Sequence, residues 1–74
     1  MAKIEFNYNK LRGRIIEICG DQKTFSEAMG MNQPTLSHKL RNNRKWTQEE
    51  ILKATEILAI PDNEVLSYFF SIKS

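Results

Sequence analysis

The stretch TFSEAMGMNQPTLSHKL, residues 24–40, decides the fold. It opens with the spacing of a helical capping box, in which Thr24 is the N-cap. Gly30 supplies the left-handed position that ends a short helix. Asn32 is a good N-cap for a second helix, and Pro34 then falls in the first turn, where its missing N–H costs no hydrogen bond. Two short helices joined by a glycine-led turn predict a helix-turn-helix.

The second of these helices has one apolar and one polar side. Leu36 and Leu40 are four residues apart and mark the inward side. A helix that enters the major groove of DNA must present short polar side chains to base edges near its N-terminus. The residues that meet this requirement are Asn32, Gln33, Thr35, Ser37 and His38.

Positive charge is concentrated around the same helix. Residues 31–48 hold four of the eleven Lys and Arg residues and none of the nine Asp and Glu residues. The net charge is +2, so this segment carries +4 and the rest of the chain −2. A local cationic cluster is typical of a phosphate-binding surface, although solubility alone is the competing explanation. The cluster consists of Lys39, Arg41, Arg44 and Lys45.

Periodic apolar residues and end signals predict three further helices. The first covers about 7–19 with Asn7 as N-cap, the fourth starts at the capping box of Thr47, and the fifth covers about 62–70. We therefore expect an all-α chain, a compact five-helix bundle in one domain of residues 1–74. The expected inward residues are Leu11, Ile15, Ile18, Cys19, Phe25, Ala28, Met29, Ile51, Ala54, Thr55, Leu58, Val65, Leu66 and Phe69.

Two segments have the composition of short extended pieces rather than of helices. They are KIEF near the N-terminus and FFSIK near the C-terminus. The tail SYFFSIKS can end the fifth helix, extend as a strand, or pair with another chain. Trp46 either stacks on a nucleic-acid base or packs against the bundle and fixes its loop, and the second role is favoured.

The residues that catalysis or metal binding would require are absent. His38 is the sole histidine and has no neighbouring carboxylate, and the chain has no glycine-rich phosphate loop. A lone Cys19 allows no disulfide within the chain and no metal-ligand spacing. No apolar run approaches the ~20 residues of a membrane span, and no signal peptide is recognised. We expect no enzyme, cofactor, metal or membrane, and a cytoplasmic location.

Two motifs carry a resemblance to a known family. FSEAMGMNQPTLS and KWTQEEILKATEILAI, in this order, resemble the Cro and lambda-repressor-like DNA-binding domains of bacteriophages and their bacterial relatives. The likeness covers nearly the whole chain. It implies a five-helix bundle with a helix-turn-helix at helices two and three. It also implies a phage transcriptional regulator of the lysis–lysogeny switch that binds double-stranded operator DNA.

The resemblance also assigns residues to DNA contacts. Gln33 matches a position that hydrogen-bonds adenine, and Ser37 and His38 match other base-reading positions. Pro34 matches one as well but offers only apolar contact, and Ser26 replaces the usual alanine. A third departure is Leu40, four residues after Leu36 where many relatives have an apolar residue at a spacing of three. These three departures bear on the tilt of the helix and on which residues read bases. The expected contacts to the DNA backbone are Gln22, Asn32, Arg41, Asn43, Arg44 and Lys45.

One short recognition helix reads only a few base pairs, so useful affinity requires two copies on neighbouring half-sites. The C-terminal aromatic residues exceed what a small core needs, and we expect Tyr68, Phe69 and Phe70 to form a dimer or partner surface. The predicted function is a Cro-like repressor that binds operator DNA as a homodimer. The alternative is an antirepressor or co-regulator that acts through protein contact with a phage repressor.

Overall fold

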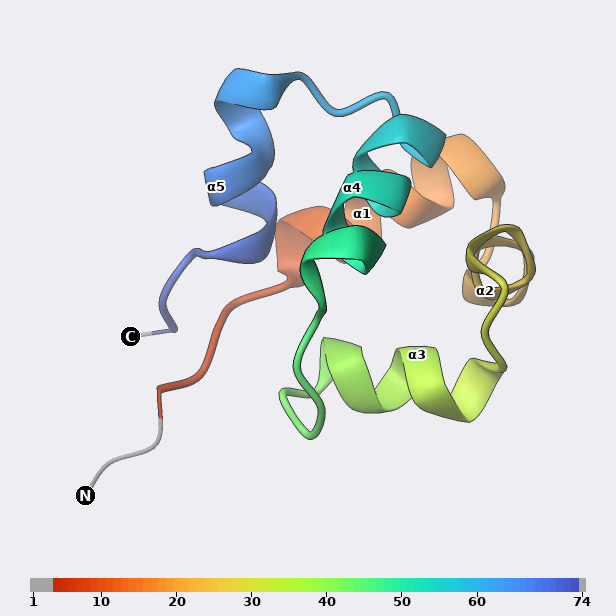
Figure 1. The fold of residues 1–74 in the computed structure, drawn as a ribbon, viewed down its shortest axis with the longest axis horizontal. Coiled ribbons are helices and arrows are strands. Elements are labelled where there is room, and N and C mark those ends of the chain that lie inside the picture. The colour runs from red at the N-terminus through yellow and green to blue at the C-terminus, as the bar shows by residue number, and fades with distance from the viewer. Residues whose placement is uncertain (1–3, 74) are drawn as a thin grey trace.

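The computed structural model describes residues 4–73, and within them the chain folds into five α-helices and one 3-10 turn (Figure 1). In chain order these are α1 (Asn9–Cys19), α2 (Gln22–Met29), α3 (Gln33–Leu40), α4 (Gln48–Ile57), η1 (Asp62–Glu64) and α5 (Val65–Phe69). The predicted all-α class and five-helix bundle are confirmed. No helix in this part of the chain is long and apolar enough to cross a membrane.

One core receives side chains from all five helices. Fully burying one large apolar side chain contributes about 1.5–3 kcal/mol. The largest fully buried apolar side chains are Phe25, Phe69, Leu11, Ile15, Leu36 and Leu58. Most of the predicted inward positions are thus confirmed, but Ile18, Ala28 and Leu66 are exposed. Leu66 is exposed because α5 is short and turns Val65 and Phe69 inward instead.

Two helices begin at residues other than those predicted. α1 follows Tyr8, and the side chain of Asn7 instead accepts a hydrogen bond from the backbone N–H of Asn9 at 2.9 Å. α2 begins earlier than expected because Asp21 is its N-cap and accepts from the backbone N–H of Thr24 at 2.7 Å. That hydrogen bond lowers the pKa of Asp21 below its ordinary value. Thr24 therefore lies inside the helix rather than before it.

The predicted start of α4 is confirmed. The hydroxyl of Thr47 accepts from the backbone N–H of Glu50 at 3.1 Å, and the carboxylate of Glu50 accepts from the backbone N–H of Thr47 at 2.9 Å. This reciprocal pair satisfies two donors that the first turn of a helix leaves without an internal partner. The loop that precedes α4 is therefore fixed at its end.

Two arginines of α1 bind the ends of other helices. Arg12 donates to the carbonyl of Leu40 at 2.8 Å, at the end of α3. Arg14 donates to the carbonyls of Leu58 and Ala59, at 2.9 and 3.1 Å, just after α4. A cation at the C-terminus of a helix satisfies free carbonyls and complements the helix dipole. These arginines therefore stabilise the packing of three helices.

The segment before α1 and the segment after α5 meet in the described part of the chain (Figure 1). Phe6 and Ile72 form an antiparallel bridge, flanked by backbone hydrogen bonds of 2.7 and 2.8 Å. The extended segments predicted at KIEF and FFSIK meet here. The tail after α5 therefore turns back along the segment that precedes α1.

Candidate functional site

The turn between α2 and α3 depends on Gly30. Its φ of 74° is left-handed, a conformation that strains any residue with a Cβ. Its N–H donates to Glu27 at 3.1 Å, and the N–H of Met31 donates to Ser26 at 3.0 Å. Ser26 is buried, and its hydroxyl donates to the carbonyl of Lys23 at 2.7 Å. Serine in place of the usual alanine therefore leaves no unpaired hydroxyl between the helices.

The outer side of α3 is here called the recognition face, and it consists of Gln33, Pro34, Thr35, Ser37 and His38. Gln33, Pro34 and His38 are exposed, whereas Thr35 and Ser37 are half-buried. Asn32 is the N-cap, and its side-chain oxygen accepts from the backbone N–H of Thr35 at 2.9 Å. That oxygen is therefore engaged in the helix start, and the exposed polar groups are few.

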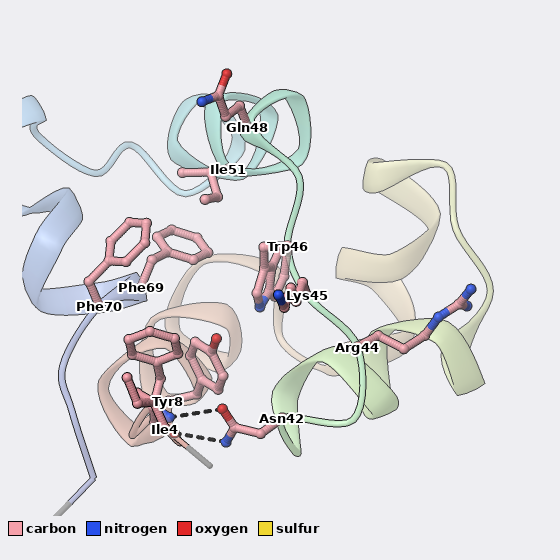
Figure 2. Close-up of a pocket in the computed structure, with 11 residues that line it drawn as sticks. Ile4, Tyr8, Asn42, Arg44, Lys45, Trp46, Gln48, Ile51, Phe69 and Phe70 are labelled. Carbon is pink, nitrogen blue, oxygen red and sulfur yellow. Dashed lines mark hydrogen bonds between the residues drawn. The ribbon is translucent and has the colours of Figure 1, made fainter. Parts of the chain in front are cut away.

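Most of the predicted phosphate contacts lie after α3 and face solvent. Arg41, Asn43, Arg44 and Lys45 are exposed, and Gln22 is half-buried at the start of α2. Arg44 extends along α3, and Lys45 lies beside Trp46 on the opposite side of the loop (Figure 2). The two cationic side chains therefore extend in different directions from one loop.

Lys39 does not belong to this exposed cationic cluster. It is 5% exposed, and its ammonium lies 2.8 Å from the carboxylate of Glu50 and 2.9 Å from the carbonyl of Lys45. Desolvation raises the pKa of Glu50, but hydrogen bonds from Lys39 and from the Thr47 backbone outweigh it, so the net pKa is lowered. This pair joins the end of α3 to the start of α4, so Lys39 has a structural role.

The prediction that three C-terminal aromatic residues form a contact surface is wrong for two of them. Tyr68 and Phe69 are buried, at 8% and 2% exposure, because they complete the core. The ring of Phe69 meets that of Trp46 edge-on at 5.2 Å, and the ammonium of Lys10 lies 4.5 Å from the ring centre of Tyr68. Phe70 is exposed, and its contact role stays a prediction.

An apolar groove of about 460 Å³ opens between the N-terminal segment, the α3–α4 loop, α4 and the end of α5 (Figure 2). We call it the aromatic groove. It is lined by Ile4, Phe6, Tyr8, Asn42, Arg44, Lys45, Trp46, Gln48, Ile51, Phe69 and Phe70. Most of these side chains are apolar, which is typical of a site for a ligand or a partner segment.

Five aromatic side chains build the groove by contacts with one another: Phe6, Tyr8, Trp46, Phe69 and Phe70. Phe6 and Phe70 meet edge-to-face at 5.8 Å, Phe6 and Tyr8 lie 6.3 Å apart, and Tyr8 and Trp46 lie 6.4 Å apart. Aromatic pairs at such distances each contribute roughly 0.5–1.5 kcal/mol beyond their burial. Burial also raises the pKa of the Tyr8 phenol. Trp46 packs against the bundle, as the sequence favours.

The indole N–H of Trp46 is buried and has no hydrogen-bond partner among the described residues. A buried donor without an acceptor costs about 1–3 kcal/mol, so native structures contain few of them. The ammonium of Lys39 lies 5.9 Å from the same ring. The indole N–H of Trp46 is thus a donor that residues 4–73 leave unsatisfied.

Asn42 joins the groove's two sides. Its φ of 64° is left-handed, and its side-chain amide accepts from the backbone N–H of Phe6 at 2.8 Å and donates to the Phe6 carbonyl at 2.9 Å (Figure 2). Asparagine tolerates this backbone conformation better than most residues. It therefore fixes both the turn after α3 and the N-terminal segment.

The sequence did not indicate this groove. Its residues are scattered over the chain, and only the surplus of aromatic residues near the C-terminus gave a signal. That surplus predicts an exposed surface, whereas two of the three rings, Tyr68 and Phe69, are buried. The aromatic residues at positions 6, 8 and 46 complete the arrangement only after folding.

Comparison with known proteins gives two findings. Residues 4–72 match the family described as "Protein of unknown function (DUF739)". The fold is similar to the solution structure of the modulator of repression (MOR) of the temperate bacteriophage TP901-1 from Lactococcus lactis, with a TM-score of 0.78. The two chains are 40% identical, and 88% of each is covered. Comparison with curated protein sequences gives no significant match.

Proposed function

The chain belongs to the DUF739 family, and from that premise we propose that it is a small phage regulator that modulates repression through direct contact with a repressor protein. The observation that carries this proposal is the 40% identity to the phage modulator of repression over 88% of both chains. At this identity and coverage, the simplest inference is that the two proteins share a regulatory role. The role is modulation of another regulator rather than repression by the chain itself.

Two features of the surface support protein contact. The aromatic groove leaves a large apolar opening, and an exposed apolar area of this kind is typical of protein-binding sites. The recognition face carries Pro34 where a base-reading side chain was expected, and Lys39 is held by Glu50. Pro34 can therefore offer a base only apolar contact, and Lys39 is held in the fold and is not free to contact a phosphate.

Direct DNA binding is the second candidate. What supports it is the short turn between α2 and α3, with Gly30 left-handed and Asn32 as the N-cap of α3, which a helix-turn-helix would need. Arg41, Arg44 and Lys45 are exposed after the other end of α3 and would contact phosphates. A Cro-like repressor built this way would bind its operator as a homodimer, with Gln33 contacting a base.

One experiment separates the two candidates. Fluorescence anisotropy would follow labelled operator DNA of the repressor from the same phage, titrated first with this chain alone and then with the chain added to the repressor–operator complex. Protein-mediated modulation predicts no sequence-specific binding by the chain alone and a change in the repressor's apparent affinity. Tight binding by the chain alone, steeply weakened by salt and dependent on Gln33, would instead support the Cro-like reading.

A further inference from the structure

The aromatic groove is continuous with other exposed apolar side chains. Ile4 and Phe70 line it and are 67% and 44% exposed, and Ile72, which pairs with Phe6 beside it, is 70% exposed. A folded chain rarely leaves a hollowed apolar surface of this kind to water without a binding role. Its walls come from segments that hydrogen bonds and ring contacts already fix, so the site is largely preformed.

The electrostatics of the groove favour an acidic occupant. Arg44 and Lys45 are among the described residues that line it, and no carboxylate is. Lys45 lies beside Trp46, whereas Arg44 extends along α3 (Figure 2). A second copy of this chain, docked groove to groove, would place two Arg44 and two Lys45 side chains in one interface, with no carboxylate among the described lining residues to pair with them. Like charges across an interface disfavour self-association, so the groove suits a different protein.

Trp46 gives a second, independent indication. Its indole N–H is a buried donor that has no acceptor among residues 4–73. A backbone carbonyl or carboxylate from an incoming segment would provide one after a small rotation of the ring. The missing hydrogen bond destabilises the free chain. Formed with the incoming segment, the same hydrogen bond would stabilise the complex.

We propose that the aromatic groove is the docking site for the repressor and receives a short apolar segment of that protein flanked by an acidic residue. This inference rests on the proposed function. Phe70 is the exposed apolar anchor, Lys45 pairs with the acidic residue, and the indole N–H of Trp46 bonds an acceptor of the segment. The recognition face takes no part in this contact.

The sequence offers a direct probe, because Trp46 is its sole tryptophan. The full chain, labelled with nitrogen-15, gives one indole N–H resonance, which is followed by NMR during titration with the unlabelled repressor of the same phage. Docking in the groove predicts a large downfield shift of this resonance and slower exchange with water. An unchanged indole resonance at saturation would overturn the proposal.

Matched variants locate the contact. Phe70→Ser is expected to weaken binding roughly tenfold or more, whereas Leu66→Ser, the same kind of change at another exposed position after η1, leaves it within about twofold. Lys45→Glu is expected to weaken binding about fivefold at low salt, and Arg41→Glu, an equal charge change outside the groove lining, has little effect. The NMR spectrum of each variant verifies that it folds.

The outcomes distinguish the two proposals. Wild-type binding to the repressor with loss in Phe70→Ser and Lys45→Glu supports the groove. Wild-type binding that these variants leave unchanged, or that Gln33→Ala and His38→Ala abolish, overturns the groove but keeps the proposed function. No binding to the repressor overturns both. A wild-type dimer in sedimentation that Phe70→Ser converts to a monomer, with repressor binding intact, assigns the groove to a second copy and also overturns the proposal.

Discussion

The recognition face and the aromatic groove lie on two sides of the α3–α4 loop, and they are built in different ways. The recognition face follows from neighbours in sequence, since Gly30 makes its turn and Asn32 starts its helix. The groove brings together residues 4–8, 42–51 and 69–70, which meet only in the folded chain. Sequence motifs therefore draw attention to the first surface, while the second, lined mostly by apolar side chains, appears only in the folded chain.

The largest expected effect is a loss of stability, and it should differ sharply between two adjacent groove residues, Phe69 and Phe70. Phe69→Ala should reduce the free energy of unfolding by about 3–5 kcal/mol, because it empties a fully buried site under Trp46. Phe70→Ala should cost only about 1 kcal/mol or less, because its ring is partly exposed to water in the folded chain. Urea unfolding followed by circular dichroism measures both, and equal losses would place Phe70 in the core as well.

The next largest effect concerns the ion pair of Lys39 and Glu50, which holds the α3–α4 loop between the two surfaces. Lys39→Ala should cost roughly 1–3 kcal/mol, since it leaves the carboxylate of Glu50 partly buried without its cation. Lys39→Met keeps the packing of the stem but still removes the cation, so the double variant Lys39→Met, Glu50→Gln should recover part of the loss. A double variant no more stable than Lys39→Met would contradict this account of the pair.

Substitutions of Asn42 test how its hydrogen bonds hold Phe6, in the N-terminal segment that lines the groove. Asn42→Ala should cost about 1–3 kcal/mol, because it removes both hydrogen bonds to Phe6 and strains a left-handed backbone. Asn42→Gly relieves the strain and loses only the hydrogen bonds, so it should be the milder change. Thermal unfolding of both variants gives the order, and a milder Asn42→Ala would refute the strain.

The pH dependence of stability tests the same loop without altering its shape. The folded-state pKa of Glu50 is lowered, so its contribution is fully present above its unfolded value of 4.5 and is lost as pH falls through the folded pKa below that. The stability difference between wild type and Glu50→Gln should therefore shrink on acidification below this value. A difference that stays constant throughout acidification would show that the pair contributes nothing through ionisation.

The smallest expected effect is a gain in stability from a substitution at Gly13, which belongs to neither the recognition face nor the groove lining. A Cβ added at Gly13, in the middle of α1, meets no atom within 4 Å. Gly13→Ala should therefore stabilise the chain by about 0.5–1 kcal/mol through helix propensity. It should leave repressor binding unchanged, which calorimetric titration measures. A loss of binding would reveal a contact on α1 that neither surface includes.

The sequence was sufficient for the parts of the fold that short-range chemistry determines. The glycine turn, the N-cap at Asn32 and the capping box at Thr47 are all as predicted, because each is encoded within four residues. The start of α2 was misplaced because Asp21 and Thr24 are both good N-caps, and only backbone geometry decides between them. Helix boundaries are the least certain feature that such signals give.

The candidate site was harder to predict for a physical reason. Whether Tyr68 and Phe69 face solvent depends on how the short α5 packs against Trp46, which no local spacing specifies. The pairing of Lys39 with Glu50 likewise needs the loop between them to close. The exposed positions of Gln33, His38 and Arg41 followed from helical periodicity alone.

The central claim is that the chain modulates a repressor through the aromatic groove and not through base reading. The most direct measurement is repressor occupancy of its operator in the presence of matched variants, followed by anisotropy of labelled DNA. We predict that Gln33→Ala with His38→Ala changes occupancy as wild type does, while Phe70→Ser with Lys45→Glu has no effect on it. The opposite result, with the groove variant active and the recognition-face variant inactive, would contradict the account.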